Sequence, residues 1–456
     1  MFLIRLFRRI LFGTYIRGFV FSYLLFMITG AILLSLPASL QPGVHIDMVD
    51  ALFTSASALS TTGLTTVSPR DTFSLFGQTV LIMIIQIGGI GLIMLVALFW
   101  LVVGRKIGFK QRNMIMTDQN QLSRGGIVRF VRDVLIMIFI IQFTAFSVMT
   151  IHLVMRGTFP LNEALFQSFF LTISLFTNAG FDIAPVGVSF SMYATDYTMQ
   201  SLAMFLMFLG AVGFWPLAEF KEFVVAKLHR ETFTFSIFVK TLFFLHFGIW
   251  FFSAIMIFMI ERNGFLVDRN VIETVYYSLF MALTTRNAGF STMDVSLLRE
   301  SSQLFIIILM FIGASPNSAG GGVRTSTVLV AGLLLYSYAR GKDRVTYNRR
   351  FIKTETVDKA IIALLFATAI IMVNLFLLTL VEPHGIKNLS FELVSAFGTT
   401  GLSLGITDTL TTFGKSILII TMFIGRVGVI ALLLMFRPST KKVSAYEYPE
   451  TDMIVG

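Results

Sequence analysis

Long apolar runs recur along this chain, and each is followed by a shorter apolar segment and then by a further apolar run. A helix needs about 20 apolar residues to cross a bilayer. Runs long enough to do so include Phe19–Leu36, Val134–Met155, Lys240–Ile260 and Ala360–Val381. The shorter segments are predicted to be re-entrant, because they cannot span: Ala51–Ser60, Ala164–Phe176, Ile272–Leu283 and Phe391–Phe397. The pattern predicts an integral membrane protein.

A glycine motif follows each short segment: LSTTGL at 59–64, FTNAGF at 176–181, TRNAGF at 285–290 and GTTGL at 398–402. Its glycines, at 63, 180, 289 and 401, lie 117, 109 and 112 residues apart. A second glycine element begins 25, 30, 24 and 24 residues later, at Gly88, Gly210, Gly313 and Gly425. Two linked motifs in constant register indicate four internal repeats.

The repeats predict an all-α fold with eight transmembrane helices and four re-entrant pore helices around a central pore, with pseudo-fourfold symmetry. Each repeat is a helix, a pore helix and an exit helix. The expected boundaries are 1–103, 104–227, 228–340 and 341–436, followed by a cytoplasmic tail at 437–456.

Charge separates along the chain in a way that predicts orientation. Five segments are rich in basic residues: 1–17, 104–133, 219–240, 340–359 and 437–456. Together they hold 25 Lys and Arg against 11 Asp and Glu, a net charge of +14, whereas the net charge of the whole chain is +10. Positive charge gathers on the cytoplasmic side of membrane proteins. We therefore expect a multi-pass protein of the cell membrane with both termini cytoplasmic, and no nucleic-acid partner. The first apolar run is predicted to be a retained helix rather than a signal peptide, because it is too long and lacks a cleavage site.

The residue content excludes several kinds of chemistry. The chain has no Cys, so disulfides, Cys-ligated zinc and iron–sulfur clusters are excluded. Its five His are scattered, and no phosphate-binding glycine loop is present. We therefore expect no enzyme activity and no cofactor bound by this chain, so any nucleotide control must come from a partner.

The glycine motifs themselves suggest ion coordination. Irregular backbone at membrane depth is tolerated where it lines a pore, and rings of backbone carbonyls can replace the hydration shell of K⁺. The pore helices would direct their partly negative ends at the ion. We call the four stretches the glycine segments: Thr61, Thr62 and Gly63; Thr177, Asn178, Ala179 and Gly180; Arg286, Asn287, Ala288 and Gly289; Thr399, Thr400 and Gly401. The alternative is four tight turns between helices. Gly88, Gly210 and Gly425 are expected to allow close helix packing.

The third exit helix is interrupted at 313–322, between the apolar runs Leu304–Ile312 and Val328–Tyr336, and we expect no such break in the other three. Glycine and proline make a continuous helix costly there. A loop beneath the filter could obstruct the pore; the alternative is a packing kink. The candidate gate residues are Gly313, Ser315, Asn317, Ser318, Gly320, Gly321, Gly322 and Arg426.

Three Arg residues fall at membrane depth. Arg426 needs a partner there, and the carbonyls of the 313–322 segment are the natural acceptors, which would make it a positive barrier and a latch; the alternative is a structural or snorkelling Arg. Arg286 is expected to brace the third glycine segment or to pair with an outer carboxylate. Arg324 would contact a regulatory partner or be solvated at the inner interface.

The motifs T-T-G-L at 61–64 and 399–402 and N-A-G-F at 178–181 and 287–290 resemble the four filters of the Trk/Ktr/HKT superfamily. M-F-I-G-A-S at 310–315 and M-F-I-G-R-V-G at 422–428 resemble its Ktr branch. The resemblance implies the membrane subunit of a potassium uptake system, homodimeric, with an intramembrane gating loop. It also implies a cytosolic RCK-type ring, KtrA/KtrC-like, that binds ATP, ADP or another nucleotide. Sodium stimulates many members. In the plant branch a Ser at the first glycine accompanies Na⁺ selectivity; all four glycines here favour K⁺.

Other functions are compatible with the same sequence features. The chain could be a Na⁺-selective pore or a K⁺/Na⁺ symporter of the same superfamily. An alternating-access transporter is another class, but such folds typically use two inverted halves rather than four parallel copies. A receptor or scaffold that transports nothing would leave the repeats unexplained.

Overall fold

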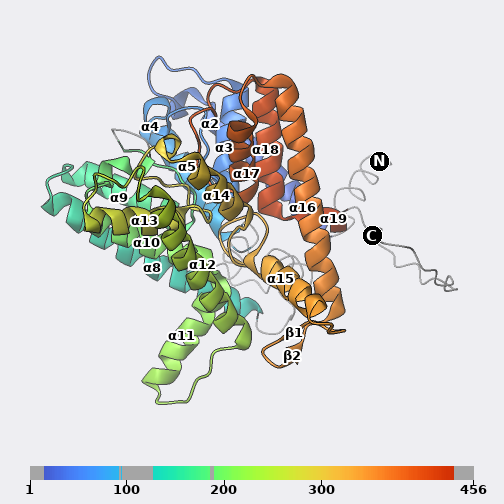
Figure 1. Cartoon of the computed structure of the whole chain (residues 1–456). Coiled ribbons are helices and arrows are strands. Elements are labelled where there is room, and N and C mark those ends of the chain that lie inside the picture. The colour runs from blue at the N-terminus through green and yellow to red at the C-terminus, as the bar shows by residue number, and fades with distance from the viewer. Residues whose placement is uncertain (1–14, 92–93, 95–126, 185–188, 436–456) are drawn as a thin grey trace, which may run out of the picture.

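The computed structural model describes residues 15–91, 94, 127–184 and 189–435 of the chain, and these are predominantly helical, with loops between the helices (Figure 1). The described strands, β1 (Thr346–Tyr347) and β2 (Arg350–Phe351), form a small antiparallel hairpin in which Tyr347 pairs with Arg350. The predicted tail at 437–456 and most of the linker that begins the second repeat lie outside the described residues.

Each repeat begins with a long helix, and these four are apolar and long enough to cross a bilayer: α2 (Tyr15–Leu34), α8 (Ile127–Met155), α12 (Ile237–Glu261) and α16 (Thr354–Val381). All four begin before the apolar run that predicted them. In α12 the hydroxyl of Ser236 accepts the N–H of Val239 and caps the first turn. The protein is thus an all-helical membrane protein.

A short pore helix follows in each repeat: α3 (Met48–Ser60), α9 (Leu161–Phe176), α13 (Val271–Thr284) and α17 (Ile386–Gly398). All four begin earlier than the apolar segments suggested and end at the glycine segments. α3 and α17 end because Thr61 and Thr399 adopt the left-handed conformation, with φ of 55° and 50°. A β-branched residue rarely takes this conformation, so the surrounding structure must hold it there.

The exit helices are α5 (Leu75–Ile90), α10 (Tyr197–Val212) with α11 (Phe214–Leu228), α14 (Glu300–Phe311) with α15 (Thr325–Ala339), and α18 (Thr412–Val427) with α19 (Val429–Met435). The expectation that only the third would break is wrong. The second and fourth bend by 103° and 93°. The bends fall at Gly213 and Gly428, whose φ values are 105° and 90°, and α5 ends at the equivalent Gly91, with φ 95°. Positive φ is easily adopted only by glycine, so the second glycine elements of the first, second and fourth repeats each end a helix.

What distinguishes the third exit helix is the length of its interruption, which separates α14 from α15 by thirteen residues, 312–324. The break at Gly213 or Gly428 takes a single residue. Short elements lie in the connections of the described repeats. One of them, η1 (Pro37–Ser39), precedes the pore helix α3. The others lie between a pore helix and the exit helix of the same repeat: α4 (Pro69–Thr72), η2 (Ser189–Tyr193) and η3 (Val295–Leu297).

The repeats pack in a closed cycle. The exit helix of each repeat contacts the pore helix of the next: α5 packs on α9, α10 on α13, α14 on α17, and α18 returns to α3. Figure 1 shows the pore helix α9 beside α8 and α10, the pore helix α13 beside α10, and the pore helices α3 and α17 beside α18. This arrangement matches the predicted helix–pore helix–helix repeat with pseudo-fourfold symmetry. The number of eight complete spans and the repeat boundaries stay predictions.

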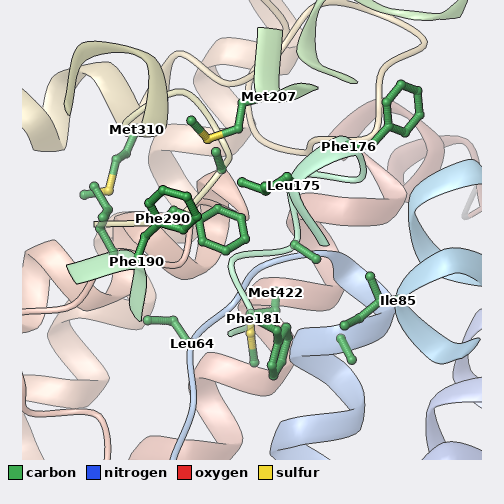
Figure 2. Packing of buried hydrophobic residues seen from close by; sticks show 14 of the residues in the cluster. Leu64, Ile85, Leu175, Phe176, Phe181, Phe190, Met207, Phe290, Met310 and Met422 are labelled. Carbon is green, nitrogen blue, oxygen red and sulfur yellow. The ribbon is translucent and has the colours of Figure 1, made fainter. Parts of the chain in front are cut away.

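A buried hydrophobic cluster surrounds the glycine segments from behind. Leu64, Phe181, Phe290 and Leu402, which follow the four glycines, are each no more than 2% exposed. Figure 2 shows the first three among other buried side chains, including Met207, Met310 and Met422 of the exit helices. Close packing on the outside of the ring leaves its backbone little freedom to move.

Candidate ion pathway

The four glycines predicted to share an axis form a closed ring. A Cβ placed on Gly63 would lie 2.7 Å from the Cα of Gly180, and one on Gly180 would lie 3.3 Å from the Cα of Gly289. The same construction places Gly289 against Gly401, and Gly401 against Gly63, at 3.1 Å each. The ring therefore closes in the order of the repeats, and the structure brings together segments that are more than a hundred residues apart in sequence.

Backbone oxygens are available at this ring. The carbonyls just before the glycines belong to Thr62, Ala179, Ala288 and Thr400, and each lies beside the glycine of a neighbouring repeat. Within the described residues none of these four carbonyls accepts a backbone or side-chain hydrogen bond. Buried carbonyls are nearly always paired with a donor, so these four oxygens are free to accept a ligand from the adjoining cavity, and a cation is one such ligand.

A hydroxyl group on each pore helix holds the glycine segment from behind, which sequence reasoning missed. Ser57 and Ser395 accept the N–H groups of Gly63 and Gly401, both at 3.0 Å. Ser174 donates to the carbonyl of Phe181 at 2.7 Å, and Thr284 does the same to Phe290 at 2.6 Å. A signal was present, since a Ser stands six residues before the glycine in three repeats.

The polar side chains of the glycine segments mostly form hydrogen bonds with groups outside these segments. Thr177 donates to the carbonyl of Ile173 in its own helix, and Thr62 shares a hydrogen bond of 2.6 Å with Ser60. Asn178 lies against Gly210 of α10. Only Thr400 has a buried hydroxyl without a partner among the described residues of these segments. The arrangement makes the backbone, not the side chains, the main source of oxygen ligands.

The 313–322 segment lies against all four repeats. Thr61 of the first repeat donates to the carbonyl of Ala319 at 2.8 Å. The N–H groups of Ser315 and Ala319 donate to α10 of the second repeat, at Ala211 and Gly210. In the fourth repeat, Thr399 accepts the N–H of Gly321 at 2.7 Å. The remaining predicted residues lie in the same loop. The carbonyl of Asn317 accepts the N–H of Phe214, and the hydroxyl of Ser318 donates to the carbonyl of Ser315. Gly320 packs on Asn287 of the third repeat, and the N–H of Gly322 donates to the carbonyl of Gly425.

Arg426 lies where the segment meets the first repeat. Its guanidinium donates to the carbonyls of Ala319 and Gly88, and to the hydroxyl of Thr61 at 3.3 Å. No carboxylate is within ion-pair distance of it among the described residues. The guanidinium is therefore a positive charge held by carbonyl oxygens and a hydroxyl rather than by an anion.

The other two membrane-depth arginines are placed differently. Arg286 is 1% exposed and bonds to His246 of α12 and to the carbonyl of Gly313, so it does not pair with an outer carboxylate. Arg324 donates to the carbonyls of Ser315 and Gly320 and thereby closes the loop on itself. Gly88, Gly210 and Gly425 pack against carbonyls at the ends of the pore helices, which confirms close helix packing at these positions.

Two cavities flank the ring and the segment beneath it. The outer cavity, of about 500 Å³, is lined by all four glycines and by Asp182, Asp294 and Asp408. The inner cavity, of about 100 Å³, is lined by Asn317, Gly322, Arg426 and neighbouring residues. Acidic side chains at the outer mouth raise the local concentration of cations. The geometry is that of a pathway whose two ends are separated by the ring and the 313–322 segment.

A ring of backbone oxygens between two cavities in a four-repeat helical bundle is an arrangement suited to cation transport across a membrane. The chain belongs to the TrkH family: residues 25–445 match the family model, which is described as a cation transport protein. This is a family of transport proteins, not of enzymes.

Several known proteins are similar over nearly the full length. The chain is 40% identical to the Ktr system potassium uptake protein D of Bacillus subtilis, over 95% of both chains. It is 34% identical to protein B of the Ktr system from the same organism, again over 95% of each. The potassium/sodium uptake protein NtpJ of Enterococcus hirae is 28% identical, over 95% of this chain and 96% of that one. The crystal structure of the potassium transporter TrkH from Vibrio parahaemolyticus shares the fold, with a TM-score of 0.70 and 17% identity over 92% of this chain and 84% of that one.

Proposed function

We propose that this protein is the membrane subunit of a potassium uptake system and conducts K⁺ through the ring formed by the four glycine segments. A dehydrated K⁺ enters from the outer cavity and is coordinated by the backbone carbonyls of the four repeats. The electrochemical gradient drives it inward. The names of the two Bacillus subtilis relatives, at 40% and 34% identity, support potassium as the cargo.

The observation that carries this proposal is the closed ring of Gly63, Gly180, Gly289 and Gly401, with the unpaired carbonyls that precede them. Replacing the water around a K⁺ requires several oxygens at once, held so that they do not collapse onto each other. The hydroxyl braces behind each segment and the tight packing of the cluster supply that rigidity.

The 313–322 segment acts as the gate in this proposal, and Arg426 holds it closed. The segment lies between the ring and the inner cavity and contacts each of the four repeats. Its bonds are mainly single hydrogen bonds from backbone groups, which can exchange for water when the loop moves. Arg426 adds an electrostatic barrier to the obstruction by the loop.

Control of that gate falls to a cytosolic partner. We infer that the protein is a homodimer with one pore per subunit, docked on an RCK-type ring that binds ATP, ADP or another nucleotide. The support is the similarity to two Ktr system potassium uptake proteins over 95% of their length. Sodium dependence is part of the proposal as well, since one relative is named a potassium/sodium uptake protein.

The test is ion flux into proteoliposomes that contain the purified full chain. We expect uptake of radioactive rubidium, a K⁺ substitute, that unlabelled K⁺ suppresses, and that a Ktr-type cytosolic subunit with nucleotide changes. Flux of Na⁺ in preference to K⁺ would instead favour a Na⁺-selective pore. Saturable exchange that needs a counter-ion would favour an alternating-access transporter, and a complete lack of flux would overturn the proposal.

A further inference from the structure

Two adjacent residues of the third glycine segment hold the two ends of the 313–322 segment. We propose that Arg286 and Asn287 couple the conformation of the ion-coordinating ring to that of the gate, acting as positioning residues. This inference rests on the proposed function, because it assigns a mechanism of control to the same pathway. Neither residue needs to touch the ion for the coupling to operate.

Arg286 fixes the first end. It follows pore helix α13, and its side chain points back to α12, where Nη1 donates to Nδ1 of His246 at 2.9 Å and to its carbonyl at 3.2 Å. Nη2 donates to the carbonyl of Gly313 at 3.4 Å. A guanidinium can only donate, so Nδ1 of His246 must accept, and the imidazole is neutral with its proton on Nε2.

The environment makes this anchor difficult to replace. Arg286 is 1% exposed and His246 is fully buried, and no carboxylate pairs with the guanidinium in the part of the chain that the structure describes. A buried cation without an anion depends on every carbonyl that surrounds it. Displacement of Gly313 would remove one of these few acceptors, so Arg286 opposes movement of this end of the loop.

Asn287 reaches the second end through one intermediate residue. Its Nδ2 donates to Thr399 Oγ1 at 3.2 Å and to the carbonyl of Gly398, across the boundary between the third and fourth repeats. The same Thr399 Oγ1 accepts the N–H of Gly321 at 2.7 Å. A Cβ on Gly320 would lie 2.6 Å from Cγ of Asn287, so the loop also rests directly on this side chain.

The two ends meet in a narrow neck. Ile312 and Val323 form a parallel bridge, and Gly313 packs against the backbone of Gly321 and Gly322. Loop opening therefore has to displace a neck that is tied to residues 286 and 287 on both sides. Because those residues adjoin Gly289 of the ring, a shift of the neck changes the backbone that coordinates the ion, and the reverse also holds.

The experiment measures flux and selectivity together for Arg286→Gln and Thr399→Val in proteoliposomes of the full chain, without any cytosolic subunit. Arg286→Gln removes the anchor at Gly313, and Thr399→Val removes the hydroxyl between Asn287 and Gly321 without changing side-chain shape. We expect each to raise basal rubidium flux by about fivefold or more, the lower range of coupling between sites, and to lower the K⁺/Na⁺ flux ratio at the same time.

The matched control is Gln142→Leu, which breaks a partly buried pair of hydrogen bonds between Gln142 of α8 and Gln86 of α5, at 3.0 and 3.1 Å, in which no glycine segment and no residue of the 313–322 segment takes part. It should leave both quantities unchanged. A rise in flux with unaltered selectivity, or the reverse, would overturn the coupling. If Arg286→Gln does not fold, the result for Thr399→Val decides. Wild-type protein without K⁺ flux would instead refute the proposed function itself.

Discussion

Arg426 and Thr61 meet beneath the ring although 365 residues separate them, with Nη1 donating to the hydroxyl at 3.3 Å. Both also donate to the carbonyl of Ala319 in the 313–322 segment. The fourth and first repeats are therefore joined to the loop at a single carbonyl oxygen. A contact of this kind makes the closed position of the loop depend on the arrangement of two repeats.

Arg426→Gln should increase ion flux and weaken its regulation. The substitution removes the positive charge and most of the donors that hold Ala319 and Gly88, while a polar side chain remains. Loss of charge-assisted hydrogen bonds costs about 1.5–3 kcal/mol each, enough to change a closed–open equilibrium by tenfold or more. Rubidium flux in proteoliposomes measures the effect. Arg129→Gln, which removes an exposed Arg that pairs with the buried Asp133, is the control, and equal flux in both variants would contradict the role of Arg426.

Gly63→Ser should lower the preference for K⁺ over Na⁺. A Cβ at this position would lie 2.6 Å from the carbonyl oxygen of Ala179, so the ring must distort. Gly43→Ala is a control for backbone strain, because Gly43 also has positive φ, 81°, but open space around it. The ratio of K⁺ to Na⁺ flux is the measurement. An unchanged ratio in Gly63→Ser would mean that the ring does not select the ion.

Gly88→Ala should destabilise the protein by about 1–3 kcal/mol, the usual cost of overpacking. The added methyl group would lie 2.8 Å from the carbonyl carbon of Leu59, at the end of pore helix α3. Gly248→Ala in α12 meets no atom within 4 Å and should stabilise slightly, since alanine favours a helix by about 0.5–1 kcal/mol. Melting temperatures in detergent compare the pair. Equal changes in melting temperature for the two variants would refute close packing at Gly88.

Asp182 should make stability and flux depend on external pH. Burial raises the pKa of this carboxyl, in the loop after the second glycine segment, from 3.8 to about 7. Between these values the folded protein binds more protons than the unfolded chain, so its stability falls as pH rises from about 4 to 7. Ionisation above that range adds negative charge to the outer cavity, and flux at low K⁺ should rise.

Asp182→Asn should weaken both of these dependences, and a smaller dependence should remain because burial also raises the pKa of Glu392, in pore helix α17, to about 7. Asp408→Asn changes an exposed acid of the same cavity, so it should lower flux at every pH and leave the pH dependence in place. Thermal unfolding and rubidium flux between pH 5 and 8 provide the two readouts. A wild-type pH dependence that persists in Asp182→Asn would show that another group is responsible.

The repeat architecture could be predicted from the sequence because its signals are local. Apolar length identified the long helices, and the spacing of Gly63, Gly180, Gly289 and Gly401 identified four units. Close packing at Gly88, Gly210 and Gly425 was also predictable, since small residues in membrane helices commonly serve that purpose. These features depend on a residue and its near neighbours in the chain.

The breaks at Gly213 and Gly428 were missed for a physical reason. A single glycine within an apolar run is compatible with a continuous helix, and its positive φ becomes visible only when neighbouring elements force it. The hydrogen bonds of the Ser57 and Ser174 hydroxyls were missed for a related reason. The backbone groups to which they bond lie on a turn whose geometry the sequence does not specify.

The sequence by itself determined a membrane protein of four similar units and the residues that bear its glycine segments. Only the tertiary structure decided that these segments close into one ring, that Arg286 turns away from the outside toward His246, and that one loop contacts all four repeats. Hydrophobic length and glycine spacing act within a segment, whereas ring closure and the partners of a buried charge depend on groups more than a hundred residues apart, whose positions are fixed only when all the helices pack together.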